Sequence, residues 1–200
     1  MGARFILLRH GQIQANKAGR WHGSTDSPLT WRGRRQAKRT GRHIRRSLDL
    51  AAVYSSPLQR CQATARYASQ GQNLDLQVVD GLQEMSIGAW EDTPFRELVD
   101  RHDFINQSLA NVHYAAPQGE SLAQVASRVT DAFRHIDAQH SDDDTVLVVS
   151  HGVALGIALG VFLHDSPTEW INYPFHNCAL TEFVLSPDPQ VRRINDYAHL

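Results

Sequence analysis

Two His-Gly dipeptides have the setting that phosphoryl-transfer chemistry requires. His10-Gly11 follows the apolar run 5–8, and His151-Gly152 follows the apolar run 145–149. An unprotonated imidazole is a competent nucleophile near neutral pH and needs no activating base. Arg9 stands beside the first histidine, and a guanidinium can hold phosphate through paired hydrogen bonds and offset its charge. The sequence therefore offers His10 as a nucleophile toward a phosphate, with a structural histidine at a strand end as the alternative.

Further charged residues would complete such a site. We expect His10 to stay neutral, because positively charged neighbours such as Arg9 lower the pKa of a histidine. We expect His151 to be protonated and to bind phosphate. Arg60 follows the apolar segment 51–55 and offers another guanidinium. Glu84 lies in an apolar, glycine-containing loop, where its carboxyl pKa is expected to rise. It would then protonate the leaving alkoxide, although a surface glutamate is the simpler alternative.

Strands and helices alternate along the chain and must position these residues. We expect helices over 30–47 with Thr30 as the cap, from Pro57 to about 69, over 93–102, after 121, and over 153–163. We expect strands at 3–9, 51–55, 76–79, 145–150, 179–185 and 191–196.

This order predicts an α/β fold: a three-layer α/β/α sandwich with a largely parallel central sheet. Ligand sites in such sheets form beyond the carboxyl ends of strands, so His10 and His151 are expected to face one crevice. The length of 200 residues suits a single domain, 1–200, with a small cap-like segment around 91–117.

Composition limits the classes of function. No apolar run reaches the roughly 20 residues of a membrane span, and no signal peptide is evident, so we expect a cytoplasmic protein. Only two cysteines are present, Cys61 and Cys178, which indicates reduced thiols instead of a disulfide framework. The net charge of −1 argues against general nucleic-acid binding. The helix over 30–47 is nevertheless strongly basic, and we interpret it as a solvated face, with a surface that gathers anionic substrates as the alternative.

Several short motifs occur in one order from residue 6 to about residue 183. Together they resemble the histidine phosphatase superfamily, specifically its phosphoglycerate-mutase-like branch. The motifs are Leu8-Arg9-His10-Gly11-Gln12, Asn16, Asp26-Ser27-Pro28-Leu29-Thr30, Ser55-Ser56-Pro57-Leu58-Gln59-Arg60, Glu84 with Gly88 and Trp90, Gly119-Glu120-Ser121, Ser150-His151-Gly152 and Asn177-Cys178-Ala179-Leu180-Thr181.

The resemblance implies a covalent phosphohistidine on His10 and a proton donor in Glu84. Arg9, Arg60 and His151 would bind the phosphoryl oxygens, with no metal and no cofactor. Further substrate contacts are expected at Gly11, Gln12, Asn16, His22, Gly23 and Gly152.

Two places depart from the pattern of the family. His22-Gly23 stands where many relatives have Gln-Gly, and Glu91-Asp92 stands where relatives often have Glu-Gly. Both departures bear on the choice of substrate more than on the chemistry.

Alternatives to a phosphatase of a small phosphate monoester remain. A mutase shares the first half-reaction, but only about 30 residues separate Glu84 from Gly119, which leaves little room for an elaborate cap. A catalytically inactive phospho-ligand-binding protein is a second alternative. A metal enzyme is a third, although the eleven histidines show no HxH or HxxxH spacing. We expect no nucleic-acid or membrane partner, and the apolar helix 153–163 is compatible with a homodimer.

Overall fold

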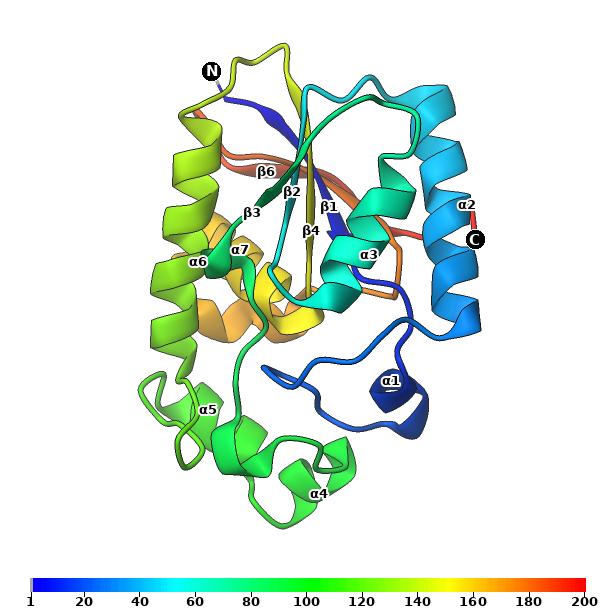
Figure 1. Ribbon diagram of the computed structural model, residues 1–200. Coiled ribbons are helices and arrows are strands. Elements are labelled where there is room, and N and C mark those ends of the chain that lie inside the picture. Colours follow the sequence, from blue (N-terminus) through cyan, green and yellow to red (C-terminus); the bar gives the residue numbers. More distant parts are fainter. Residues whose placement is uncertain (1) are drawn as a thin grey trace.

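A six-stranded mixed sheet forms the centre of the computed structural model, which describes residues 2–200 (Figure 1). The strand order is β3-β2-β4-β1-β5-β6. The first four strands in this order are parallel, and β5 and β6 run antiparallel to their neighbours. The strands are β1 (Arg4–Arg9), β2 (Ala52–Ser55), β3 (Leu76–Val78), β4 (Thr145–Ser150), β5 (Leu180–Val184) and β6 (Gln190–Asp196). The expected α/β class with a largely parallel sheet is confirmed.

The central strands are buried on both faces, which explains why their sequences are unbroken apolar runs. In β1, Phe5 and Leu7 join the core on one side of the sheet, whereas Ile6 and Leu8 join the core on the other side. Helices α6 (Leu122–Asp137) and α7 (Gly152–His164) contribute to the first core. Helices α2 (Trp31–Ser47) and α3 (Gln59–Ala68) contribute to the second, so the expected three layers are present (Figure 1).

Helix starts follow local hydrogen bonding. The Thr30 hydroxyl oxygen accepts a bond from the backbone N–H of Gly33 at 3.0 Å, which confirms Thr30 as the cap of α2. The prediction for Pro57 is wrong. Helix α3 begins at Gln59 with Leu58 as its cap, so Pro57 lies before the helix and not in its first turn.

The segment expected to form one helix over 93–102 forms two. Helix α4 (Phe95–Asp100) ends early, and α5 (Phe104–Ala110) follows it. Asp103 between them has a left-handed backbone with φ of 48°, which no continuous right-handed helix allows. Both short helices lie beyond the carboxyl ends of the central strands, where a cap segment was expected (Figure 1).

Short elements fill the remaining connections. They are α1 (Gln14–Ala18) and the 3₁₀ turns η1 (Asp80–Leu82), η2 (Gly88–Trp90) and η3 (Pro167–Asn172). Helix α7 packs against both η3 and α6, and its apolar side chains from Ala154 to Leu159 are buried within the chain. Cys61 and Cys178 are free and buried. No helix within residues 2–200 is long and apolar enough to cross a membrane.

Candidate active site

The register of two neighbouring strands brings His10 and His151 together. Strands β1 and β4 are parallel, and Arg9 pairs with Ser150 at their carboxyl ends. The next residue of each strand is the histidine, so both imidazoles leave the same edge of the sheet. Their ring centroids lie 5.2 Å apart. The sequence predicted that both histidines face one crevice; the structure places their rings side by side, but only His10 lines the pocket described below.

His10 is held in an orientation suited to nucleophilic attack. Its Nδ1 lies 2.8 Å from the carbonyl oxygen of Gly11. Because a carbonyl only accepts hydrogen bonds, we assign the proton to Nδ1 in this tautomer. The lone pair then resides on Nε2. The backbone of His10 is fixed as well, since its N–H donates to Ser150 and its carbonyl accepts from Nδ2 of Asn177 at 2.9 Å.

The surroundings of His10 favour the neutral imidazole. Burial lowers its pKa well below the ordinary histidine value, and the positive charges of Arg60 and Arg9 lower it further. Only 3% of the residue is exposed. The His10 imidazole is therefore unprotonated near neutral pH.

We expect the pH dependence of kcat/KM to reflect this lowered pKa. Protonation of His10 removes the lone pair, so activity is lost only as pH falls through the lowered pKa. The acid limb attributable to the enzyme should lie below about pH 6.5, the ordinary value for histidine. Steady-state rates between about pH 4 and about pH 8, corrected for the second ionisation of the substrate phosphate, measure it. An enzyme limb at or above the ordinary histidine value would contradict the assignment.

His151 differs from the expectation of a protonated phosphate ligand. Burial lowers its pKa well below the ordinary value, and Arg60 and His10 lower it further. The Nε of Arg60 donates to Nδ1 of His151 at 3.3 Å, and Nε2 of His151 lies 2.8 Å from the hydroxyl of Ser56. Since Nδ1 accepts, the proton is on Nε2 and the ring is neutral. A bound dianion would raise the pKa of both histidines.

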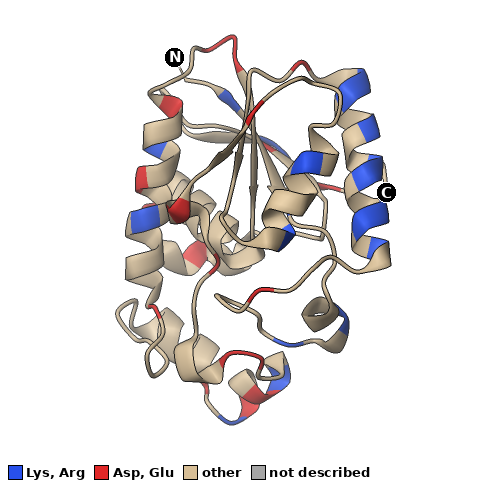
Figure 2. Ribbon diagram, viewed as in Figure 1, with Lys and Arg blue, Asp and Glu red and all other residues tan. Residues whose placement is uncertain are grey.

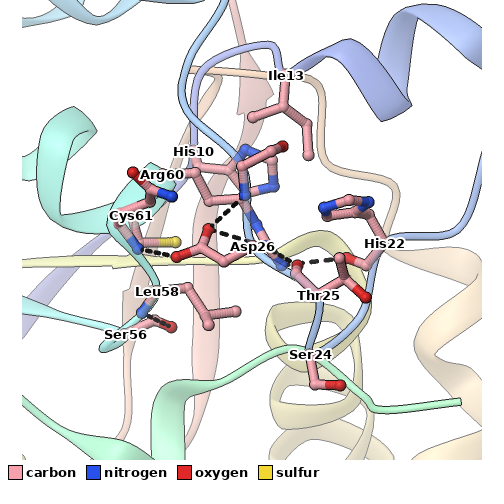
Figure 3. A network of polar contacts seen from close by, with 12 residues as sticks. His10, Ile13, His22, Ser24, Thr25, Asp26, Ser56, Leu58, Arg60 and Cys61 are labelled. Atoms are coloured by element: carbon pink, nitrogen blue, oxygen red, sulfur yellow. Dashed lines mark hydrogen bonds and ion pairs between the residues drawn. The ribbon is translucent and has the colours of Figure 1, made fainter. Parts of the chain in front are cut away.

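Arg60 is the central residue of a polar network (Figure 3). Its side chain is fully buried at the start of α3. All five N–H donors of a guanidinium have acceptors here. The acceptors are the carbonyls of His22, Gly23 and Thr25, a carboxylate oxygen of Asp26 and Nδ1 of His151. In this arrangement Arg60 fixes the loop 22–26, and a phosphate contact from Arg60 requires some of these bonds to be exchanged.

Glu91 holds the same loop from its other side. Its carboxylate accepts hydrogen bonds from the backbone N–H groups of Gly23, Ser24 and Thr25 at 2.9, 3.1 and 3.2 Å. Gly23 also approaches the backbone closely, because a Cβ there would lie 2.2 Å from the carbonyl oxygen of Met85. The loop 22–26 is thus fixed by an acid at its N–H groups and by an arginine at its carbonyls.

The carboxyl group of Glu84, which belongs to the loop after η1, lies against the N-terminus of α7. One carboxylate oxygen accepts from the N–H groups of Met85 and Ala154, both at 3.0 Å, and the other accepts from Val153 at 3.3 Å. These bonds hold the carboxyl group at the edge of the sheet from which His10 projects. Glu84 is the one Asp or Glu side chain, among the residues described, that lines the pocket beside His10.

A pocket of about 560 Å³ opens beside His10. It contains six of the residues expected from the sequence and excludes five. The six that line it are Arg9, His10, Asn16, His22, Glu84 and Gly152. The five that do not are Gly11, Gln12, Gly23, Arg60 and His151. For Gly11 the reason is steric: a Cβ there would lie 2.6 Å from the carbonyl of Gly33, so this glycine allows contact with α2 and not with a ligand.

Arg9 has an incompletely paired guanidinium. One Nη donates to the carbonyl of Phe175 at 2.6 Å, while Nε is buried and has no partner. Burial lowers the pKa of Arg9, and Glu84 partly opposes this effect. A buried donor without a partner costs free energy, and an anion that accepts a hydrogen bond from Nε of Arg9 would remove this cost.

Apolar and aromatic residues form much of the pocket wall. Trp21 and Phe95 stack with ring centroids 6.1 Å apart, and both line the pocket. Another part of the pocket wall comes from the segment 170–175, which follows α7. No helical or alternating pattern marks this segment in the sequence, which is why it was missed.

His22 and Asp92, one residue from each of the two departures from the family pattern, are in contact. Nδ1 of His22 lies 2.6 Å from a carboxylate oxygen of Asp92. Nε2 of His22 is buried without a partner and belongs to a side chain that lines the pocket. Asp92 has a left-handed φ of 62°, a conformation that glycine, asparagine and aspartate tolerate best. Hence the carboxylate orients the imidazole toward the pocket.

No metal centre is evident among the described side chains. Within residues 2–200, no group of three or more His, Cys, Asp or Glu residues is arranged to hold a metal ion. Cys61 lies 3.3 Å from Nε2 of His151, but burial raises the pKa of its thiol far above the ordinary value. The pocket therefore presents the imidazoles of His10 and His22, the guanidinium groups of Arg9 and Arg20, and the carboxyl group of Glu84.

Comparisons with known proteins agree on one family. The model of the histidine phosphatase superfamily (branch 1) matches residues 5–197. Phosphoserine phosphatase 1 of Hydrogenobacter thermophilus is 34% identical over 155 residues, covering 76% of this chain and 72% of its own. A "probable phosphoglycerate mutase" of Citrobacter koseri is 29% identical and is covered over 93% of its length, with 97% of this chain covered.

Longer proteins and solved structures extend this picture. A bifunctional protein of Mycobacterium tuberculosis is 32% identical across 98% of this chain, but the chain spans only 55% of that protein. Phosphoserine phosphatase of Entamoeba histolytica, solved with 3-phosphoglyceric acid, superposes with a TM-score of 0.88 at 26% identity, covering 99% of both chains. The α-ribazole phosphatase of Shigella flexneri gives a TM-score of 0.83 at 26% identity, covering 96% of both chains.

Proposed function

We propose that this chain, which belongs to branch 1 of the histidine phosphatase superfamily, is a metal-independent phosphatase of a small phosphate monoester. The observation that carries the proposal is the state of His10. Its Nδ1 is engaged by Gly11, its pKa is lowered, and its ring lines a pocket that also contains Glu84. Phosphatases are among the relatives and the solved neighbours.

The first proposed step is in-line attack. Nε2 of His10 forms a bond to phosphorus as the bond to the leaving oxygen breaks, and the proton of the Glu84 carboxyl group passes to that oxygen. Arg9 binds the equatorial oxygens of the phosphoryl group that is transferred, through its unpartnered Nε. Arg60 and His151 join it once phosphate displaces part of their present bonding.

The second proposed step returns the enzyme to its starting state. Water attacks the phosphohistidine, Glu84 takes a proton from that water, and the nitrogen–phosphorus bond breaks. A mutase would need to exclude water at this stage. From the segment 91–117 only Phe95 lines the pocket, so the cap covers little of the site and favours hydrolysis.

The pocket also supports a class of leaving group. Its wall is rich in aromatic and apolar side chains, and Glu84 is its one carboxyl group among the residues described. We propose a leaving group with an apolar or ring-bearing body, since such walls bind apolar surface and fix its orientation through few polar groups.

The experiment that tests the function is a measurement of phosphate release with a chelator present. The panel contains p-nitrophenyl phosphate, phosphoserine, 3-phosphoglycerate and α-ribazole 5′-phosphate. We expect turnover that the chelator does not reduce. Release that requires an added metal would overturn metal independence, and isomerisation of phosphoglycerate without release would establish a mutase.

We predict that His22 and Asp92 act as one unit in substrate selection. Nδ1–H of His22 donates a hydrogen bond to the carboxylate of Asp92. Nε2 of the same ring is then an acceptor for a hydroxyl or amine of the leaving group. Asp92→Asn keeps the left-handed backbone but weakens the orienting bond. We expect it to lower kcat/KM by about tenfold, the lower end for residues that orient a functional histidine.

A double-mutant cycle tests the unit. His22→Gln alone and His22→Gln with Asp92→Asn should give nearly equal kcat/KM, because the second change has no partner left to disturb. Asp100→Asn is the matched control, as this carboxylate lies in the same segment and pairs with exposed Arg96. If the fold-loss of kcat/KM in the double variant equals the product of the two single losses, the two residues act independently.

The remaining expectations stay predictions. A small-molecule phosphate monoester is the proposed partner, and a cytoplasmic location is proposed with it.

A further inference from the structure

A second pocket lies beside α2, separate from the catalytic pocket except for a shared residue, Asn177. Its volume is about 670 Å³. We call it the arginine pocket and define it by Trp31, Arg32, Arg35, Arg39, His176 and Tyr197.

The arginine pocket carries positive charge that no Asp or Glu side chain among the described residues offsets. Helix α2 has eight Lys and Arg residues and no acid, although the whole chain has a net charge of −1 (Figure 2). Arg32, Arg35 and Arg39 share one helix face by their spacing of three and four. Within residues 2–200, none of these three forms an ion pair with an Asp or Glu, and no Asp or Glu side chain lines the pocket. Such a concave, one-sign surface attracts anions.

Exposed aromatic rings border the same pocket. Trp31 is 74% exposed and Tyr197 is 53% exposed, the two highest values among the large exposed apolar side chains described. The guanidinium of Arg35 lies 5.5 Å from the centre of the Trp31 ring. The sequence showed no aromatic residues interleaved along the basic face, and the fold supplies Tyr197 from the end of the chain. Rings exposed next to guanidinium groups suit a flat ligand that carries negative charge.

The floor of the arginine pocket touches the backbone that carries the nucleophile. Oε1 of Gln36 accepts from the N–H of Gln12 at 3.1 Å, and Nδ2 of Asn177 donates to the carbonyl of His10 at 2.9 Å. Gln12, Gln36 and Asn177 all line the pocket. A ligand bound there would lie behind the loop that positions His10.

We propose that the arginine pocket is a second ligand site, which binds a nucleoside diphosphate or a ligand of the same chemistry. Guanidinium groups bind phosphate oxygens through paired hydrogen bonds, and three of them on one face match a diphosphate. The exposed rings stack on the base. The volume lies within the range of small-molecule sites, roughly 300–1,000 Å³.

Calorimetric titration with ADP tests the site, with a chelator present and with the 200-residue chain carrying His10→Ala to prevent turnover. The test variant combines Arg32→Gln, Arg35→Gln and Arg39→Gln. The control combines Arg42→Gln, Arg45→Gln and Arg46→Gln, which removes the same charge from the same helix outside the pocket. We expect the test variant to raise the Kd at least about tenfold and the control less than about twofold.

Other outcomes overturn the proposal. Equal weakening in both variants means nonspecific attraction, and no weakening or no binding means that ADP does not use this pocket. Trp31→Leu should weaken ADP but not tripolyphosphate; equal effects on both ligands would remove the stacking role. Tighter binding of a short oligothymidylate than of ADP, with a steep salt dependence, would assign the surface to single-stranded nucleic acid.

Discussion

His10→Ala is expected to abolish phosphate release, with kcat falling by roughly 10⁴-fold or more, as for other removed nucleophiles. In the proposed mechanism the other groups of the pocket bind phosphate or move protons, and none of them can replace the Nε2 lone pair that attacks phosphorus. The change leaves β1 intact, because the strand ends at Arg9 and its pairing uses backbone atoms. Steady-state release from the best substrate of the panel measures the loss.

Two controls make this result specific to the nucleophile. His135→Ala removes an exposed imidazole on α6 and should leave kcat unchanged. Rapid quenching of the wild type with substrate should yield a phosphorylated peptide that contains His10, and the variant should yield none. Retention of more than a few per cent of the activity by His10→Ala would sink the phosphohistidine mechanism.

Glu84→Gln is expected to divide substrates by their leaving groups. Alkyl phosphates need a proton on the departing oxygen, and loss of a general acid costs about 10²–10⁴-fold. The phenolate of p-nitrophenyl phosphate leaves without one, so its first step should change far less. The N–H groups of Met85 and Ala154 share one carboxylate oxygen of Glu84, and the amide oxygen of glutamine can replace it. Only the longer bond from Val153 to the other oxygen is lost, so the local fold should persist.

The ratio of kcat/KM values for an alkyl and an aryl phosphate measures this effect. Glu97→Gln serves as the matched control, since Glu97 pairs with exposed Arg101 on the surface of α4. An equal loss for both kinds of substrate would remove Glu84 from the role of proton donor.

The sequence predicts the fold correctly in the segments whose structure is determined by burial alone. Strands β1 and β4 are covered on both faces, so their apolar runs are continuous and each ends at a His-Gly dipeptide. The elements that were missed, such as α1 and η3, are short and depend on contacts with distant segments. Helix α7, for example, supplies the surface on which η3 packs.

The site was predictable at its chemical centre and not at its supports. His10, Arg9 and Glu84 were found because their residue types suit phosphoryl transfer. The roles of Glu91 and Asp92 depend on contacts with residues about 70 positions earlier, which no local spacing reveals. Arg60 was identified, but its full set of bonds to the loop 22–26 was not foreseeable, because those acceptors are mostly backbone carbonyls.

The division between sheet and pocket wall has an evolutionary consequence. His10 follows β1, which lies between β4 and β5 and is buried along its middle, so most substitutions there disturb one core or the other. The wall comes from segments around 19–22, 95 and 170–175, which lie outside the sheet. Substitutions in the wall can therefore alter the pocket without disturbing the strands that hold His10. Similar chains carry the names of a phosphoserine phosphatase and an α-ribazole phosphatase, so one scaffold is associated with different substrates.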